Sequence, residues 1–168
     1  MIAVAQRSFA VLALVAAVIA VVVTVLLVRR RVPVWLRDEV ALPLATAIAV
    51  VATGGSLLLS EVAGYVPCEL CWYQRIAMYP LTVVLGVAAW HRDDRAYRVV
   101  TPLAGFGSVI AVWHIAIERN PSLGGVCDPA APCSLRWVEE FGFLTLPTMA
   151  LIAFLAITAL TLAARRPS

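Results

Sequence analysis

Long apolar runs separated by short polar segments dominate the pattern of residues along this chain. Five runs are long enough for a helix to cross the hydrocarbon core of a bilayer, which takes about 20 residues; they cover residues 8–28, 40–60, 71–90, 101–117 and 143–163. The alternating strands of a membrane β-barrel are absent from the sequence. We therefore expect an all-α integral membrane protein, a four-helix transmembrane bundle with one extra N-terminal transmembrane helix.

Two units are expected, divided after the first basic loop. Residues 1–38 would form the extra N-terminal helix and a basic cytoplasmic loop, and residues 39–168 the four-helix domain. The first run resembles a signal peptide, but it exceeds the usual apolar length of about 7–15 residues. Arg29-Arg30-Arg31 follows it as a stop-transfer signal. We expect it to be retained as a spanning helix.

Capping residues and prolines predict where the last two spans begin. Thr101-Pro102 opens the fourth run, and proline is favoured at the first helical position after a capping residue. Thr145 and Pro147 could play similar parts near Phe143, at the start of the fifth run. We thus expect helices that begin at these two points.

The composition argues against a soluble domain. Hydrophobic residues make up 62% of the chain and charged residues only 14%, whereas about a quarter of the residues in a soluble domain are charged. The net charge of +3 comes from arginine alone, and these arginines cluster at the ends of the apolar runs. Membrane topology explains this pattern better than nucleic-acid binding does. We expect a lipid environment and no nucleic-acid partner.

The distribution of arginine predicts the orientation. One set of loops would hold nine arginines and the opposite set four, and the richer side is expected in the cytoplasm. The first set is Arg29, Arg30, Arg31, Arg37, Arg92, Arg95, Arg98, Arg165 and Arg166; the second is Arg7, Arg75, Arg119 and Arg136. The N-terminus would then lie outside and the C-terminus inside. Outer aromatic residues, Tyr65 and Trp137 among them, agree with this orientation.

Four cysteines lie in two close pairs, at the outer ends of the predicted helices. Cys68 and Cys71 precede the third run, and Cys127 and Cys133 lie between the fourth and fifth runs. Two loops separated by two crossings must share one side of the membrane. The arginines indicate that this is the extracytoplasmic side, where disulfides persist.

The Cys68-Glu69-Leu70-Cys71 pair lies at a predicted helix start. A helix N-terminus and a nearby cation both lower the pKa of a cysteine, and thiolate is the reactive form. Arg75 lies one turn beyond Cys71 on the same helix face. The short ring favours thiol–disulfide exchange, although a static disulfide or half of a zinc site remains an alternative.

The second pair, Cys127 and Cys133, is separated by five residues. Alone it could be a structural disulfide within a loop. Beside a C-x-x-C pair on the same side of the membrane, it indicates a second redox-active pair. After it, Leu135, Val138 and Phe141 recur at helical spacing. We expect a short interfacial helix there, with an ordinary connector as the alternative.

Three further polar residues on the outer side are candidate contacts for an electron acceptor. Arg75 would be costly in lipid without a partner, so it must snorkel, find a partner or contact the acceptor. His114 lies near the outer end of the fourth run and could instead be a satisfied helix-packing residue. Gln74 could donate a hydrogen bond. No metal site is expected.

The run from Pro67 to Pro80, which contains Cys68, Cys71 and Arg75, closely resembles the disulfide bond formation protein B (DsbB) family, especially its BdbC-type branch. The resemblance covers roughly residues 40–163. It implies that residues 39–168 form a four-helix redox domain of a thiol:quinone oxidoreductase in the bacterial cytoplasmic membrane. Such a protein reoxidises an extracytoplasmic thioredoxin-like (DsbA-like) thiol oxidase and reduces the membrane quinone pool, either ubiquinone or menaquinone.

The resemblance also implies residue roles. Cys127 would accept the attack of the partner's thiolate, and the released Cys133 would attack Cys68. Cys71 would then pass electrons to the quinone, and Arg75 would stabilise negative charge on the quinone oxygen. The helix at 8–28 precedes the family core. The C-x5-C spacing of the second pair is that of the BdbC-type branch, whereas the best-known members place these cysteines much farther apart.

Other functions stay open at this point. A vitamin K epoxide reductase-like protein is also helical and quinone-linked, but its C-x-x-C is expected near the end of the bundle. A non-enzymatic membrane scaffold could use both disulfides as braces. A conduit that carries reducing power outward would need thiols near the cytoplasmic side, where this sequence has none.

Overall fold

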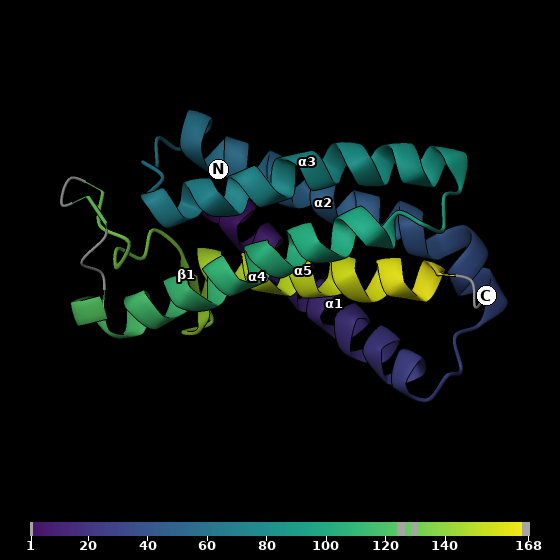
Figure 1. The fold of residues 1–168 in the computed structure, drawn as a ribbon. Coiled ribbons are helices and arrows are strands. Elements are labelled where there is room, and N and C mark those ends of the chain that lie inside the picture. The colour runs from purple at the N-terminus through teal and green to yellow at the C-terminus, as the bar shows by residue number, and fades with distance from the viewer. Residues whose placement is uncertain (1, 124–126, 129–130, 166–168) are drawn as a thin grey trace.

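The computed structural model describes residues 2–123, 127–128 and 131–165, and most of them are helical (Figure 1). The five helices are α1 (Ile2–Val28), α2 (Ala41–Leu57), α3 (Glu69–His91), α4 (Tyr97–Arg119) and α5 (Leu146–Ala164). Leu36–Val40 and Leu58–Val62 are π-helical and extend α2 at both ends, and Pro121–Leu123 is a 3-10 turn. Two short strands, β1 (Glu139–Glu140) and β2 (Leu144–Thr145), form a hairpin. Arg166 and the end of the expected second unit lie outside the described residues.

Four helices among the described residues are long and apolar enough to cross a membrane. They are α1, the continuous helix Leu36–Val62, α4 and α5. The protein is therefore a helical, multi-pass membrane protein. Residues 71–90 are helical as predicted, within α3, but α3 is not among these four. Its first turns contain Gln74 and Arg75, which lower its hydropathy.

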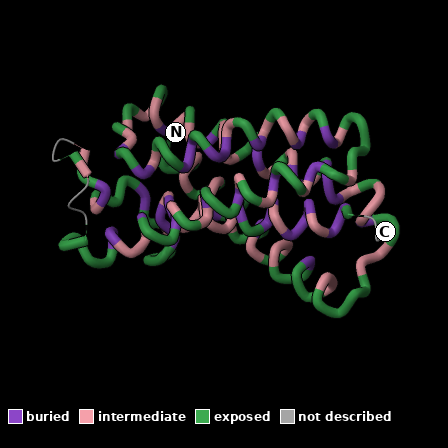
Figure 2. Tube along the Cα trace, viewed as in Figure 1, coloured by how far each residue is buried: buried purple, intermediate pink, exposed green. Residues whose placement is uncertain are grey.

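The core lies between α2, α3, α4 and α5. Leu81, Leu85, Val100, Phe154 and Leu160 are almost completely buried there, and buried positions follow the inner faces of the helices in Figure 2. Small residues let the helices approach closely, as is common in membrane bundles. A Cβ added at Gly107 in α4 would collide with the ring of Phe154 in α5. Only glycine at position 107 leaves room for that ring.

Helix α1 lies at the edge of the bundle. It packs mainly against α5, and its C-terminal half diverges from the other helices in Figure 1. Only Ala10, Ala16 and Val23 of its residues are buried. Most of the remaining surface is apolar, as expected for a helix that faces lipid, and the exposed Arg7 lies near its N-terminal end.

The predicted start of the fourth span at Thr101-Pro102 is wrong. Helix α4 begins at Tyr97 and contains Pro102. Proline removes one N–H, whose partner in a regular helix would be the carbonyl of Arg98. The loss falls near the helix end, so the helix continues through it. Thr145, in contrast, is the residue that flanks the start of α5, with Pro147 in its first turn, as expected.

The predicted interfacial helix over residues 134–141 is also wrong. These residues have no helix, and Glu139–Glu140 instead pairs with Leu144–Thr145. Phe141 and Gly142 have positive φ angles, which suits a tight hairpin turn. Val138 is buried whereas Leu135 and Phe141 are exposed, so these three residues do not share one buried face.

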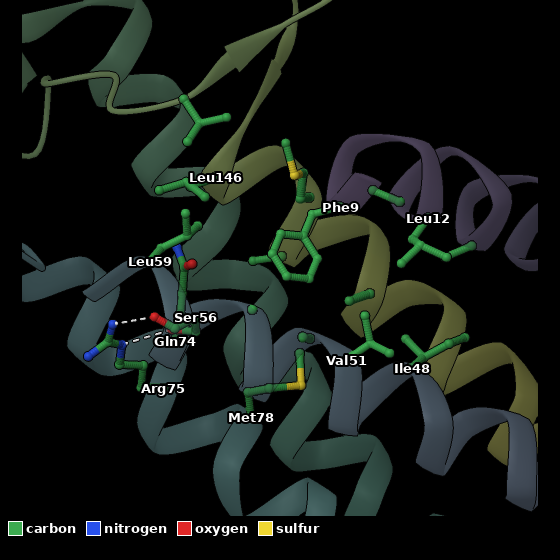
Figure 3. A pocket seen from close by; sticks show the side chains of 18 of the residues that line it. Phe9, Leu12, Ile48, Val51, Ser56, Leu59, Gln74, Arg75, Met78 and Leu146 are labelled. Atoms are coloured by element: carbon green, nitrogen blue, oxygen red, sulfur yellow. Dashed lines mark hydrogen bonds between the residues drawn. The ribbon is translucent and has the colours of Figure 1, made fainter. Parts of the chain in front are cut away.

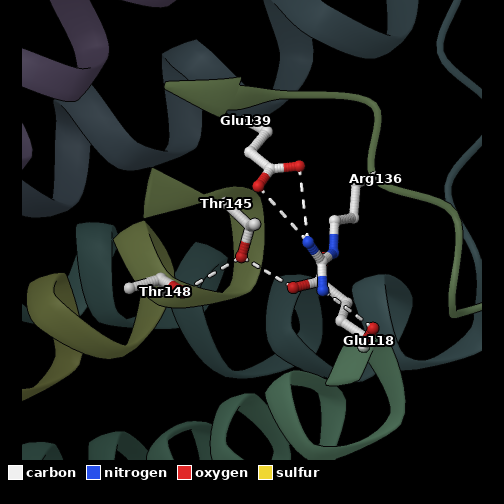
Figure 4. A network of polar contacts seen from close by, with 5 residues as sticks. All are labelled: Glu118, Arg136, Glu139, Thr145 and Thr148. Carbon is white, nitrogen blue, oxygen red and sulfur yellow. Dashed lines mark hydrogen bonds and ion pairs between the residues drawn. The ribbon is translucent and has the colours of Figure 1, made fainter. Parts of the chain in front are cut away.

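A polar network ties the hairpin to the end of α4 (Figure 4). The Thr145 hydroxyl donates to a carboxylate oxygen of Glu118 at 2.7 Å, and Arg136 donates to the Glu118 carbonyl at 3.0 Å. Arg136 also pairs with Glu139 at 3.3 Å. These contacts fix both ends of the segment that contains the second cysteine pair.

Candidate dithiol–disulfide site

The first cysteine pair is built into the start of α3. Cys68 is the N-cap residue, with extended backbone, and its Sγ accepts a hydrogen bond from the Cys71 N–H at 3.4 Å. Cys71 follows in the first turn, and its Sγ lies 3.0 Å from that of Cys68. Both thiols are free. The predicted helix start at this C-x-x-C pair is confirmed.

The second pair, Cys127 and Cys133, forms a disulfide. Cys133 is only 1% exposed, and it belongs to an apolar cluster with Cys68, Leu70 and Ile117. Cys127 is half-buried and packs at the edge of the same cluster. The structure therefore brings a dithiol and a disulfide together at one end of the bundle.

His114 in α4 lies between the two cysteine pairs. Its Nε2 is 3.7 Å from Cys68 Sγ and 3.1 Å from the carbonyl oxygen of Cys133. Its Nδ1 is 3.2 Å from the amide nitrogen of Gln74. A carbonyl only accepts, so Nε2 must be the donor, and Nδ1 then accepts from Gln74. A proton on Nε2 fits the contacts of this nitrogen with Cys133 and Cys68.

Cys68 precedes helix α3, and its surroundings favour the thiolate form. The hydrogen bond from the Cys71 thiol holds the pKa of Cys68 well below its usual range, and His114 adds to this effect. Partial burial opposes the shift because it disfavours the charged form. The hydrogen-bond donors outweigh the effect of burial on the pKa of Cys68, so its thiolate is available for thiol–disulfide exchange.

Arg75 is buried, with 9% of its surface exposed, and has found a partner inside the protein. Its Nε and Nη2 donate to the hydroxyl and the carbonyl of Ser56 in α2, at 3.0 and 3.1 Å. Its guanidinium carbon also lies 5.0 Å from the centre of the Trp72 ring. Its Nη1 makes no hydrogen bond to any described residue. A fixed cation with a spare donor thus lies one helical turn from Cys71.

A cavity of about 340 Å³ adjoins this site (Figure 3). Cys71, Gln74 and Arg75 line one end, and the remaining lining side chains from α1, α2, α3 and α5 are mostly apolar. The volume falls within the range of about 300–1,000 Å³ that is typical of ligand pockets. The Tyr79 residue also lines it, and its hydroxyl is buried without a hydrogen bond to any described residue. This cavity can hold an apolar molecule with a few polar atoms.

Cys68, Cys71 and His114 also have the donor atoms of a metal site. Their ligand atoms lie within 4.8 Å of one another. Structural zinc sites use four protein ligands, and the described residues supply three here.

Several residues of this site were not expected from the sequence. Ser56 and Tyr79 have ordinary sequence surroundings and are recognisable only from the packing. Tyr65 stacks on Trp137, with ring centroids 4.9 Å apart. The sequence contains an indication of this contact, because it predicts both residues in the outer aromatic belt. Glu118 lies one turn beyond His114 and is only 8% exposed, so the polar chemistry extends along α4.

A helical membrane protein that places a dithiol against a disulfide is a membrane thiol oxidoreductase. The family model described as disulfide bond formation protein DsbB matches residues 38–164, and the chain belongs to this family. Its role is therefore in disulfide formation.

Relatives that are named for disulfide formation agree with this assignment. Disulfide bond formation protein C of Bacillus subtilis (strain 168) is 44% identical over 66% of this chain and 81% of its own length. The probable disulfide formation protein of Oceanobacillus iheyensis is 43% identical over 68% and 81%, and the probable disulfide formation protein C 1 of Bacillus cereus (strain ATCC 10987) is 40% identical over 72% and 88%. No solved structure gives a significant match.

Proposed function

We propose that this protein is a thiol:quinone oxidoreductase, which reoxidises an extracytoplasmic thioredoxin-like dithiol oxidase and passes the electrons to a membrane quinone. The observation that carries the proposal is the continuity of the site. His114 contacts Cys68 and Cys133, which belong to the two pairs, and the apolar cavity begins at Cys71. A path for two electrons thus leads from the outer loop to the interior of the bundle.

The first step is exchange with the partner protein at Cys127. A thiolate of the partner attacks Cys127 Sγ, which forms a mixed disulfide and releases the Cys133 thiolate. The second partner thiolate resolves this bond, so the partner leaves oxidised and this chain retains two thiols. The burial difference supports the order, because Cys127 is half-buried whereas Cys133 is 1% exposed.

The second step moves the oxidation state between the two pairs. Cys133 attacks Cys68 of an oxidised Cys68–Cys71 pair and releases the Cys71 thiolate; Cys127 then attacks Cys133. The outer disulfide is restored and the inner pair is left reduced, which is the combination present in the structure. When Cys127 attacks Cys133, Cys68 leaves as a thiolate, and the His114 N–H can donate to its sulfur while this charge develops.

The last step takes place at the cavity. A quinone bound there would accept two electrons and two protons, which turns the Cys68–Cys71 dithiol into a disulfide. Arg75 fits an acceptor oxygen because its Nη1 is a spare donor beside Cys71, and Ser56 fixes its direction. The buried, unpartnered Tyr79 hydroxyl would offer a second donor on the same helix face, two turns beyond Cys71.

The proposal includes a topology of five spans. Low hydropathy does not exclude α3 as a span, because Gln74 and Arg75 are buried inside the bundle and not in lipid. The arginine distribution would place the cysteine end outside the bacterial cytoplasmic membrane, and the C-terminus inside. Residues 1–38 would then form the extra N-terminal helix and a cytoplasmic loop, and residues 39–168 the redox domain.

The test is quinone reduction by purified protein in detergent, supplied with a reduced thioredoxin-like donor. We expect Cys71→Ser to abolish quinol formation, because no dithiol remains beside the cavity. The same variant should still form a mixed disulfide with the donor through Cys127. Ser122→Ala is a control at the same end of the molecule, since its hydroxyl contacts only Asn120 among the described residues.

The result can exclude the proposal as well as support it. If Cys71→Ser reduced quinone at the wild-type rate, the cavity would not be the acceptor site. The wild-type protein could also fail to react with any thiol donor and fail to reduce quinone. The disulfides would then be braces of a membrane scaffold.

A further inference from the structure

Helix α1 precedes the residues that match the family model, yet it forms a wall of the acceptor cavity. The matched region begins at residue 38. One face of α1 nevertheless lines the cavity, with Gln6, Phe9, Leu12, Ala13, Ala16 and Ile19. These positions recur every three or four residues, as one face of a helix does. The cavity is thus a shared product of the family bundle and the additional helix.

Two contacts fix this wall in place. The amide nitrogen of Gln6 donates to the Tyr65 hydroxyl at 2.8 Å, and Tyr65 precedes the C-x-x-C pair by three residues. The ring of Phe9 lies so close to Gly55 of α2 that an added Cβ would be 3.1 Å from it. Both contacts are at the cysteine end of α1. The wall is therefore anchored next to the thiols.

The cavity opens toward the lipid side between α1 and α2. Leu12, Val15 and Val51 line it, and they are nevertheless 47%, 51% and 39% exposed. Figure 3 shows Phe9 and Leu12 of α1 on one side and Ile48 and Val51 of α2 on the other. The opening is lined with apolar side chains, so it suits a hydrocarbon chain that continues into the bilayer.

The polar end of the cavity suits the ring of a quinone, and the apolar end suits its hydrocarbon tail. Cys71 and Arg75 lie at the end where a quinone ring would react, while the α1 wall from Phe9 to Ile19 offers only apolar contacts. Ten residues of helix extend about 15 Å. That length would accommodate the first part of an isoprenoid tail.

We propose that α1 is the tail-binding wall of the acceptor site and determines the selectivity for long-tailed over tail-less quinones. This inference rests on the proposed quinone reduction and adds a role for the first 28 residues. It assigns to Phe9, Leu12, Ala13 and Ala16 direct contact with the tail.

The first test is a substitution that fills the α1 wall. Ala13→Phe should raise the KM for a quinone with a long isoprenoid tail about tenfold, and change the KM for a tail-less quinone less than twofold. Val11→Phe and Val18→Phe are matched controls on the same helix, because these residues are 50% and 63% exposed and do not line the cavity. A general loss of folding would affect both quinones alike.

The second test does not depend on activity. A quinone with a photoreactive group in its tail should label the peptide of residues 8–29, which trypsin releases between Arg7 and Arg29. Ala13→Phe should reduce this labelling, and excess unlabelled long-tailed quinone should compete with it.

The outcomes separate this inference from the proposed function. Equal KM changes for both quinones, or labelling confined to other helices, would overturn the role of α1 while wild-type quinone reduction stood. If wild-type protein reduced neither quinone, both proposals would fall together.

Discussion

The two cysteine pairs differ in how the chain holds them. Cys68 and Cys71 belong to a helix start, where the backbone fixes the positions of both sulfurs. Cys127 and Cys133 belong to an irregular segment that is tied down mainly at its ends, by the network around Glu118. A regular element thus presents the pair beside the cavity, and an irregular one presents the pair to which we assign the exchange with a partner.

Burial adds a second difference, within the outer pair itself. Cys133 is buried against His114, whereas Cys127 is half-buried at the edge of the cluster. One disulfide therefore has an accessible sulfur and an inaccessible one. The lesson is that direction in the relay can come from packing, even where the two residues are chemically identical.

The largest expected effect comes from separating the two sulfurs of the outer pair. Cys133→Ser should abolish turnover, because Cys127 then has no disulfide to exchange with the reduced partner. The free Cys127 thiolate should instead capture oxidised partner, by attacking its disulfide and releasing one partner thiolate. Cys127→Ser should also abolish turnover, but capture no partner. Non-reducing electrophoresis and mass spectrometry measure both. Capture through Cys133 in the Cys127→Ser variant would reverse the assigned order.

A smaller effect is expected at the inner pair from Arg75→Gln. Removal of one preorganised donor at a developing negative charge costs a rate factor of about 10² or more. We expect quinone reduction to slow by about that factor, while mixed-disulfide formation at Cys127 keeps its rate. Stopped-flow absorbance separates the two steps. Arg119→Gln, at an exposed position of α4, is the control for charge alone.

The smallest effect is expected from His114→Ala, which removes the side chain that contacts both Cys68 and Cys133. The lowered pKa of Cys68 keeps its thiolate populated as pH falls, and this advantage is lost only when pH drops through that pKa. Without His114 we expect a higher pKa for Cys68, because its sulfur loses a hydrogen-bond donor, and a transfer between the pairs about tenfold slower. Alkylation of Cys68 against pH, followed by peptide mass spectrometry, measures the shift.

The other histidine of the chain provides a matched control. His91 is the last residue of α3, exposed at the opposite end of the bundle. His91→Ala should leave the alkylation profile unchanged. An unchanged profile in His114→Ala as well would mean that Cys71 alone sets the pKa of Cys68.

The sequence was sufficient for the helices and for the position of the first pair. Apolar runs and the C-x-x-C spacing are local signals, and both predict correct elements. It was insufficient for the hairpin at residues 139–145, because Leu135, Val138 and Phe141 mimic helical spacing. The turn is determined by Phe141 and Gly142, whose positive φ angles a periodicity argument does not detect.

Long-range packing was beyond the sequence for the same reason. His114 and Cys68 are 46 positions apart, and Arg75 and Ser56 are 19 apart. No pattern in the intervening residues indicates that these side chains meet. The place of α1 beside the cavity was likewise unpredicted, because its apolar surface looks uniform in the sequence.

The contact of Phe154 with Gly107 has a mechanical consequence. The Phe154 ring packs directly on the backbone at Gly107, and this contact prevents α4 and α5 from sliding along each other. The end of α4 and the start of α5 therefore keep a fixed relative position. The contact between Cys133 and His114 of α4 is therefore held in place as well.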